Sequence, residues 1–128
     1  MSKRLAQTSP SVAYLRFLSQ LSAAKGGDRL PDLVPDEREI IEVLATYWLN
    51  QQNITVVGLM RHPALSRSAS TVHRRVKGLI EREMIALQTS TADSRVKFVM
   101  PTKKALRYLD QLGRCLLASV GASELEAS

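Results

Sequence analysis

The densest run of positive charge in the chain lies between Arg61 and Ile80. This stretch contains no acidic residue, and its cations are Arg61, Arg67, Arg74, Arg75 and Lys77. Arginine and lysine bind phosphates and the acceptor edge of guanine, and serine and threonine hydroxyls bind phosphates and base edges. Such charge on one helix repels itself unless a polyanion neutralises it. The run therefore favours a nucleic-acid partner over a merely solvated basic face.

A helix is expected to position these side chains. The apolar residues Val72, Val76, Leu79 and Ile80 recur at helical spacing, which predicts a helix from about Ser66–Ser68 to about Arg82. The opposite face carries Ser70, Thr71, Arg74 and Lys77. An apolar side that seats the helix and a polar side with hydroxyls and cations are what insertion into the major groove requires. The N-terminus of a helix also attracts phosphate.

The periodicity changes after this helix. Ile85–Leu87 is a short extended run, and residues 96–100 alternate apolar and other side chains, so the sequence predicts a β-hairpin with a polar tip. Arg95 lies at the tip and Lys97 at its base. A cation on such a loop can reach an adjacent minor groove. Arg95 taken alone is explained equally well as a solvated arginine.

Four further helices complete the predicted order. They are expected at about 10–25, after the Ser9-Pro10 start, and at about 36–50, 55–61 and 103–119, with a loop at 26–35. Four helices, a hairpin and a last helix predict a mainly α fold with a small β-hairpin wing, a winged helix-turn-helix. We expect one domain over 10–120 with a DNA-binding core at 36–100, flanking helices at 10–25 and 102–120, and flexible ends at 1–9 and 121–128.

The composition limits the other classes of protein. The chain has 128 residues, a net charge of +6 and 45% hydrophobic residues, which suits one globular domain with a basic surface. A single cysteine allows no intramolecular disulfide, and no histidine or cysteine spacing suggests a metal site. No metal or cofactor is predicted. No glycine-rich phosphate loop or catalytic triad indicates an enzyme, and no apolar run is long enough for a membrane span, so we expect a cytoplasmic protein.

Two motifs resemble the MarR family of bacterial regulators. The segment Ser70–Val76 resembles that family's recognition helix. The family's wing carries Asp-x-Arg, five residues and then Leu-Thr-x-x-Gly. Here Asp93-Ser94-Arg95 is followed by five residues and then by Pro101-Thr102-Lys103-Lys104-Ala105. Proline replaces the usual leucine, and alanine replaces the usual glycine. The resemblance covers about residues 36–110.

The resemblance implies roles for particular residues. Arg95 would enter the minor groove, Asp93 would orient a neighbouring arginine, and Ser70, Thr71, Arg74 and Arg75 would line the DNA side of the recognition helix. It also implies a homodimer formed through the helices at 10–25 and 102–120, which binds an inverted-repeat operator in double-stranded DNA near the nucleoid. Repression as the common mode and a small-molecule effector of unknown identity are implied as well. The full predicted DNA-binding set is Arg67, Ser68, Ser70, Thr71, His73, Arg74, Arg75, Lys77, Asp93, Arg95 and Lys97.

Several alternatives stay open at this point. The leucines of the last helix form either a dimer interface or packing within one chain. Cys115, among these leucines, is better explained as a buried thiol than as a redox sensor. Tyr47 and Trp48 are better explained by core packing than by a ligand cavity, and His73 contacts either DNA or solvent. The alternative function is a winged helix that binds proteins, or an accessory module of replication or partition.

Overall fold

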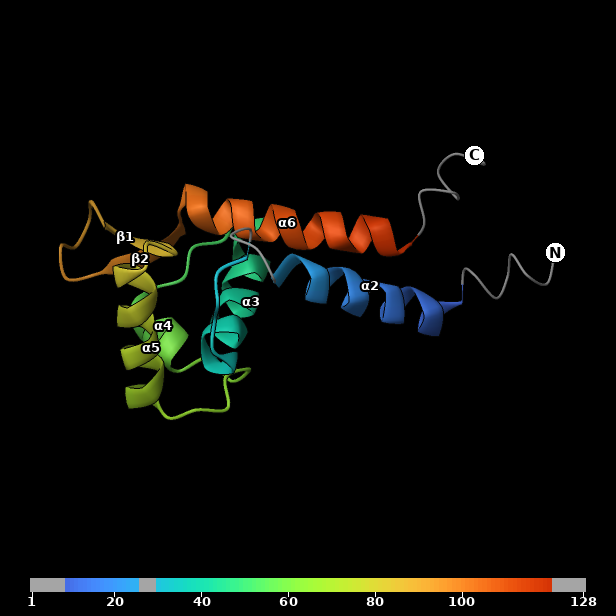
Figure 1. Ribbon diagram of the computed structural model, residues 1–128. Helices are drawn as coiled ribbons and strands as arrows, with labels where there is room; N and C mark the ends of the chain where they lie inside the picture. The colour runs from blue at the N-terminus through green and yellow to red at the C-terminus, as the bar shows by residue number, and fades with distance from the viewer. Residues whose placement is uncertain (1–8, 26–29, 121–128) are drawn as a thin grey trace. The chain divides into compact units, whose positions relative to one another are not determined.

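The computed structural model describes residues 9–25 and 30–120 (Figure 1). The element order is α2 (Pro10–Lys25), α3 (Pro35–Leu49), α4 (Val56–Met60), α5 (Ala69–Glu81), β1 (Ile85–Thr89), β2 (Lys97–Pro101) and α6 (Lys103–Ser119). This order confirms the predicted fold class, a mainly helical chain with a hairpin wing. Residues 1–8 of the end predicted at 1–9, the end predicted at 121–128, and residues 26–29 of the predicted loop lie outside the described residues.

The chain divides into two compact units, and each is described by itself. One unit is Leu33–Leu106, which contains the helix-turn-helix, the hairpin and the start of α6. The other contains α2 and α6 from Arg107 onward.

The apolar stripes of α3, α4 and α5 meet in the core of the Leu33–Leu106 unit. Their central side chains are at most 2% exposed, and they are Ile40, Ile41, Leu44, Leu59, Val72, Val76 and Leu79. Met84, just before β1, and Ile85 and Val99 of the hairpin close the same core. The predicted apolar face of α5 is therefore buried, and its polar face is left outward.

The hairpin is antiparallel, with Ile85 opposite Pro101 and Thr89 opposite Lys97. Pro101 is the last residue of β2 rather than the first residue after it, which corrects the predicted boundary by one position. Proline lacks an N–H donor, and a strand end tolerates that loss. A further contact was not predicted: the Val99 N–H donates to the Ile54 carbonyl at 2.9 Å. The segment at Ile54 is too short to show the two-residue period of a strand, so its residue pattern does not predict this contact.

The first turn of α3 holds a buried acid. The helix begins at Pro35, one residue before the predicted start, and proline suits that first position. Glu37 is 5% exposed. Its Oε1 accepts hydrogen bonds from the Val34 N–H at 3.0 Å and from Arg82 Nη1 at 2.9 Å. Glu37 thus joins the start of α3 to the end of α5.

Replacing Glu37 by Ala is expected to lower the free energy of unfolding by about 2 kcal/mol. That is less than the roughly 3–5 kcal/mol for breaking a fully buried ion pair, because the Arg82 side chain is 36% exposed and water screens it. Urea unfolding followed by circular dichroism measures the difference. Glu42→Ala, which removes an exposed acid from the same helix, is the control and should change stability by at most about 0.5 kcal/mol. Equal effects of the two substitutions would contradict a structural role for Glu37.

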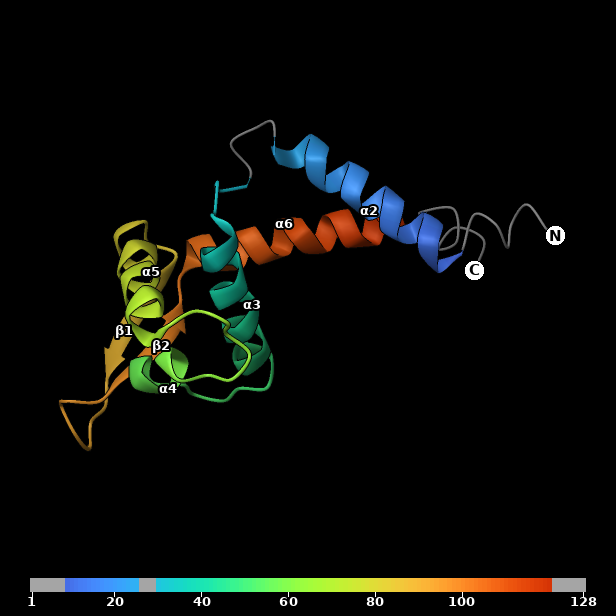
Figure 2. The same cartoon turned by 90° about the horizontal axis from the view of Figure 1, so that it is seen from below.

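The unit of α2 and α6 leaves much apolar surface uncovered. The two helices lie side by side in both views of the ribbon (Figures 1 and 2). Tyr108 and Cys115 are buried, and the 4% exposure of Cys115 confirms that its thiol is buried. Large apolar side chains remain 42–63% exposed on this unit, and they are Tyr14, Leu15, Leu18, Leu116 and Leu117. None of the described helices is long and apolar enough to cross a membrane.

Candidate nucleic-acid interface

The N-terminus of α5 is fixed by hydroxyl groups. Ser68 is the N-cap, and its Oγ accepts from the Thr71 N–H at 3.3 Å and donates to Thr71 Oγ1 at 3.0 Å. The Ser70 hydroxyl lies 3.2 Å from the same Ser68 oxygen. Ser68 and Thr71, two of the predicted DNA-binding residues, therefore also define where the helix begins. An N-cap of this kind stabilises a helix by about 1 kcal/mol.

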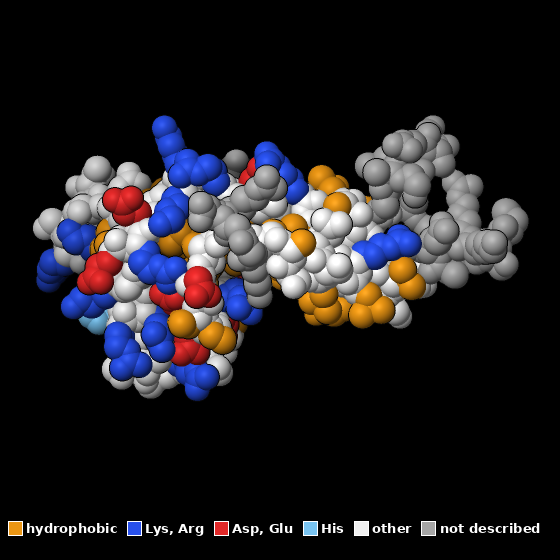
Figure 3. Space-filling view, in the orientation of Figure 1, with side chains coloured by type: hydrophobic (Ala, Val, Ile, Leu, Met, Phe, Trp, Pro, Cys, Tyr) orange, Lys and Arg blue, Asp and Glu red, His pale blue; other side chains and the backbone are white. Residues whose placement is uncertain are grey.

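The outward face of α5 carries a compact set of polar side chains. Ser70, His73, Arg74 and Lys77 are all exposed. Within the described part of the chain, Arg74, His73 and Lys77 form no side-chain hydrogen bond or ion pair. Blue arginine and lysine side chains gather over this unit in the space-filling view (Figure 3). These predicted residues come together as one cationic face, and their donors are available to a ligand.

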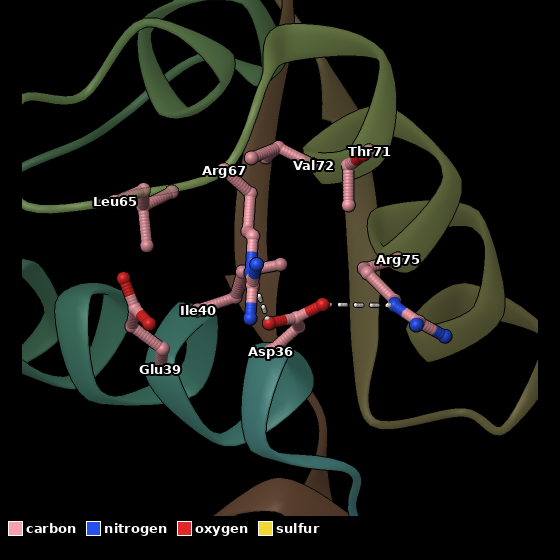
Figure 4. Close-up of a pocket in the computed structure, with 8 residues that line it drawn as sticks. All are labelled: Asp36, Glu39, Ile40, Leu65, Arg67, Thr71, Val72 and Arg75. Atoms are coloured by element: carbon pink, nitrogen blue, oxygen red, sulfur yellow. Dashed lines mark hydrogen bonds and ion pairs between the residues drawn. The ribbon is translucent and has the colours of Figure 1, made fainter.

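Two other predicted arginines, Arg67 and Arg75, face an acid of α3 instead. Arg67 Nε donates to Asp36 Oδ1 at 2.9 Å, and Arg75 Nε lies 3.6 Å from Asp36 Oδ2 (Figure 4). The interpretation that the charge on this helix is uncompensated is therefore wrong for Arg67 and Arg75. The compensating acid is distant in sequence and comes from α3. An acid in the first turn of a helix suits the helix dipole whether or not an arginine reaches it, so Asp36 carries no signal of this tertiary contact in the sequence.

The wing presents Arg95 in a fixed orientation. Its side chain is 89% exposed, and Asp93 accepts from it twice, at 3.2 Å from Nε to Oδ1 and at 3.2 Å from Nη2 to Oδ2. The Arg95 backbone N–H also donates to Asp93 Oδ1 at 3.0 Å. Asp93 thus holds the arginine two residues further along the chain. At the base of the wing, Lys97 Nζ donates to Thr89 Oγ1 at 2.8 Å, across the paired strands.

These bonds also set the charge of Asp93. The guanidinium and then the backbone N–H of Arg95 hold the pKa of Asp93 below its ordinary value. A carboxyl with a lowered pKa stays ionised, and keeps its cationic partner, at every pH above that lowered pKa. It loses the partner only when the pH falls through the pKa and the carboxylate is protonated. The Asp93–Arg95 contact should therefore persist throughout the range from about pH 5 to pH 8.

Replacing Asp93 by Asn should weaken binding of a DNA duplex by about threefold to fivefold, because loss of the charge-assisted pair that orients Arg95 outweighs the general gain from removing one negative charge. Fluorescence anisotropy with a labelled duplex measures the change. Asp110→Asn is the matched control, since it breaks an exposed Asp–Arg pair on α6 with Arg114 and should leave affinity nearly unchanged. An equal or larger effect of the control would contradict the assigned role of Asp93.

The start of α6 explains the threonine of the wing motif. Thr102 Oγ1 accepts from the Ala105 N–H at 3.0 Å and donates to the Glu83 carbonyl at 2.7 Å. Lys104 Nζ donates to the Arg82 carbonyl at 2.9 Å. Ala105 is completely buried, so a small residue is required where the family has glycine. These bonds attach the first turn of α6 to the turn between α5 and β1.

Other polar and aromatic residues are used in packing. Trp48 Nε1 donates to the Val99 carbonyl at 3.3 Å, and the rings of Tyr47 and His62 meet edge to face at 5.7 Å. Both contacts agree with core packing, the favoured interpretation of Tyr47 and Trp48. Over residues 9–25 and 30–120, no three His, Cys, Asp or Glu side chains are grouped to hold a metal ion.

Solved structures provide the comparison with known proteins, since no protein-family model and no curated protein matches the chain. The transcriptional regulator Tm0710 from Thermotoga maritima is 14% identical, with a TM-score of 0.64 over 98% of this chain and 80% of that one. MepR of S. aureus, solved in complex with DNA, is 17% identical, with a TM-score of 0.62 over 89% and 90%. The heme sensor protein PefR from Streptococcus agalactiae, solved with heme, is 21% identical, with a TM-score of 0.51 over 93% and 86%. The chain therefore has the winged helix-turn-helix fold of the MarR-family regulators.

Proposed function

We propose that this protein is a regulator of transcription that binds double-stranded DNA in a sequence-specific manner, as a homodimer and most simply as a repressor. The observation that carries the proposal is the exposed face of α5, where Ser70, His73, Arg74 and Lys77 stand together above a fully buried apolar side. The likeness to MepR, whose structure contains DNA, supports the same use of this fold.

The proposed mechanism divides the work between helix and wing. In the major groove, Arg74 offers two parallel donors to guanine or to a phosphate, and the Ser70 hydroxyl is small enough for close approach. Beside the groove, Arg95 is held by Asp93 and offers a cation to the narrow minor groove of an A·T tract.

Dimerisation is proposed from the exposed apolar side chains of α2 and α6. Contiguous leucines such as Leu116 and Leu117, at 54% and 61% exposure, are costly in water and indicate a protein partner. A second copy of the chain is that partner in the proposal, because a symmetric dimer matches a symmetric operator. The two α5 helices would then contact half-sites about one helical turn apart.

We also propose that a small-molecule effector controls DNA binding, because the similar fold of PefR was solved with heme bound. In a dimer, an effector acts by changing the distance between the two α5 helices, because an inverted repeat fixes that distance. Binding to the nucleoid would place the protein in the cytoplasm.

Duplex binding measured as a function of salt tests the proposal. Anisotropy of a labelled genomic duplex should give a linear fall of log K with log salt, with a slope of about −0.9 for each phosphate contact. Several such contacts are expected for a dimer. A protein-interaction module, the alternative function, would bind no duplex at physiological salt.

A further inference from the structure

The contact of Asp36 with two arginines has a particular geometry. Both arginines reach the carboxylate through Nε, one to each oxygen, from two sides of the Asp36 side chain (Figure 4). The Asp36 side chain is only 17% exposed, so it lies mostly beneath the arginines. Among the residues that the structure describes, none accepts a hydrogen bond from the Nη groups of Arg67 or Arg75. Asp36 thus holds each guanidinium at its inner nitrogen and leaves the outer donors available.

The surroundings restrict both arginines. Arg75 Nε is buried and has no hydrogen-bond partner within the described chain, so the Asp36 carboxylate at 3.6 Å is its compensating charge. The loop that carries Arg67 is held as well, because the Ser66 N–H donates to Glu39 Oε1 at 3.1 Å. A buried guanidinium nitrogen without a counter-charge is unfavourable. Loss of Asp36 should therefore release Arg75 from this position.

We propose that Asp36 is a positioning residue that determines sequence specificity by fixing Arg67 and Arg75 as contacts to the DNA phosphates beside α5, on the side of that helix that faces α3. This inference rests on the proposed function and deepens it. The outer nitrogens of a held arginine match phosphate oxygens. Phosphate contacts set the register of a recognition helix on the duplex, and base contacts then discriminate sequences. Arg74 stays the base-reading arginine, and Arg75, which was predicted beside it, becomes a phosphate contact.

The general effect of charge on DNA affinity has the opposite sign to the loss expected from positioning. Removing an acid near a DNA-binding surface adds one positive charge, which raises affinity for every duplex. Positioning acts differently, because a fixed register matters for the matched sequence and little for an unmatched one. The ratio of the two affinities cancels the general effect of charge and retains the effect of positioning.

The experiment compares Asp36→Ala with Glu42→Ala, which removes an exposed acid from the same helix. Affinities are measured by anisotropy for an operator duplex chosen by selection and for a scrambled duplex of the same length, at one salt concentration. Circular dichroism and gel filtration confirm that each variant is folded and keeps its oligomeric state. We expect the operator-to-scrambled ratio to fall about tenfold in Asp36→Ala and to stay unchanged in Glu42→Ala.

A second comparison tests whether Asp36 acts through the arginines. In an Arg67→Ala/Arg75→Ala background, the Asp36 substitution should cause no further loss of the ratio. An unchanged ratio in the single Asp36→Ala variant would overturn the inference. So would a loss of the ratio in the Arg67→Ala/Arg75→Ala background as large as the loss in the otherwise unchanged protein. If the wild-type protein itself binds both duplexes equally, the sequence-specific function fails and the inference fails with it. If the wild-type protein prefers the operator duplex and the Asp36→Ala variant keeps the same operator-to-scrambled ratio, the inference about Asp36 is overturned and the proposed function stands.

Discussion

Replacing Arg74 and Lys77 together by Ala should weaken binding to the operator duplex by about a hundredfold. Each cation contributes on the order of 1–3 kcal/mol when it contacts a base edge or a phosphate, and every 1.4 kcal/mol is a factor of about ten. Both side chains are exposed, so their removal should leave the core of the unit and its thermal unfolding unchanged. Anisotropy with the operator duplex measures the loss, and the salt slope should become shallower by about 1–2.

The control for this double variant is Lys103→Ala/Arg107→Ala. It likewise removes two positive charges, but from exposed positions on α6. Because net charge changes equally in both variants, general attraction to DNA falls equally. A hundredfold loss in the α5 variant with a loss of only a few-fold in the α6 variant would locate the interface on α5. Similar losses in the two variants would show that α5 has no special role.

Replacing Leu116 and Leu117 together by Asp should convert the dimer to a monomer and lower operator affinity by roughly a hundredfold, since two linked half-sites bind with that order of gain. These leucines are 54% and 61% exposed in a single chain. Charges there should leave the fold of one chain intact, while two carboxylates buried in an interface are strongly unfavourable. Analytical ultracentrifugation gives the mass, and anisotropy gives the affinity.

The matched control carries Leu49→Asp and Val57→Asp. These apolar residues are also exposed, at 81% and 56%, but they belong to the Leu33–Leu106 unit. The control should remain dimeric. A wild-type protein that sediments as a monomer, or a control that dissociates as readily as the α6 variant, would remove the dimer from the account.

The parts of this fold that depend on neighbours in the chain were predictable. The stripe of Val72, Val76 and Leu79 is a local signal, and α5 begins at Ala69, one residue after the predicted start at about Ser66–Ser68. The alternation in residues 96–100 likewise predicted strand β2, which is observed one residue later at both ends, at Lys97–Pro101. Local periodicity determines which face is buried, so these predictions needed no tertiary information.

The parts that depend on distant residues were not predictable. Asp36 and Arg67 are 31 residues apart, and Glu37 and Arg82 are 45 apart. Acids in a first turn suit the helix dipole whether or not an arginine reaches them, so their types and positions carried no signal of these pairs. The cationic face of α5 was predicted as a set, and only packing separated Arg74, which is exposed, from Arg75, which faces Asp36.

Selection of bound duplexes from a random DNA library near physiological salt tests directly whether the protein reads DNA sequence as a dimer. We expect enrichment of an inverted repeat whose half-sites lie about one helical turn apart. It also predicts that the Arg74→Ala/Lys77→Ala variant enriches no such repeat. Recovery of duplexes without a common sequence, or no recovery at all, would contradict a sequence-specific dimeric regulator.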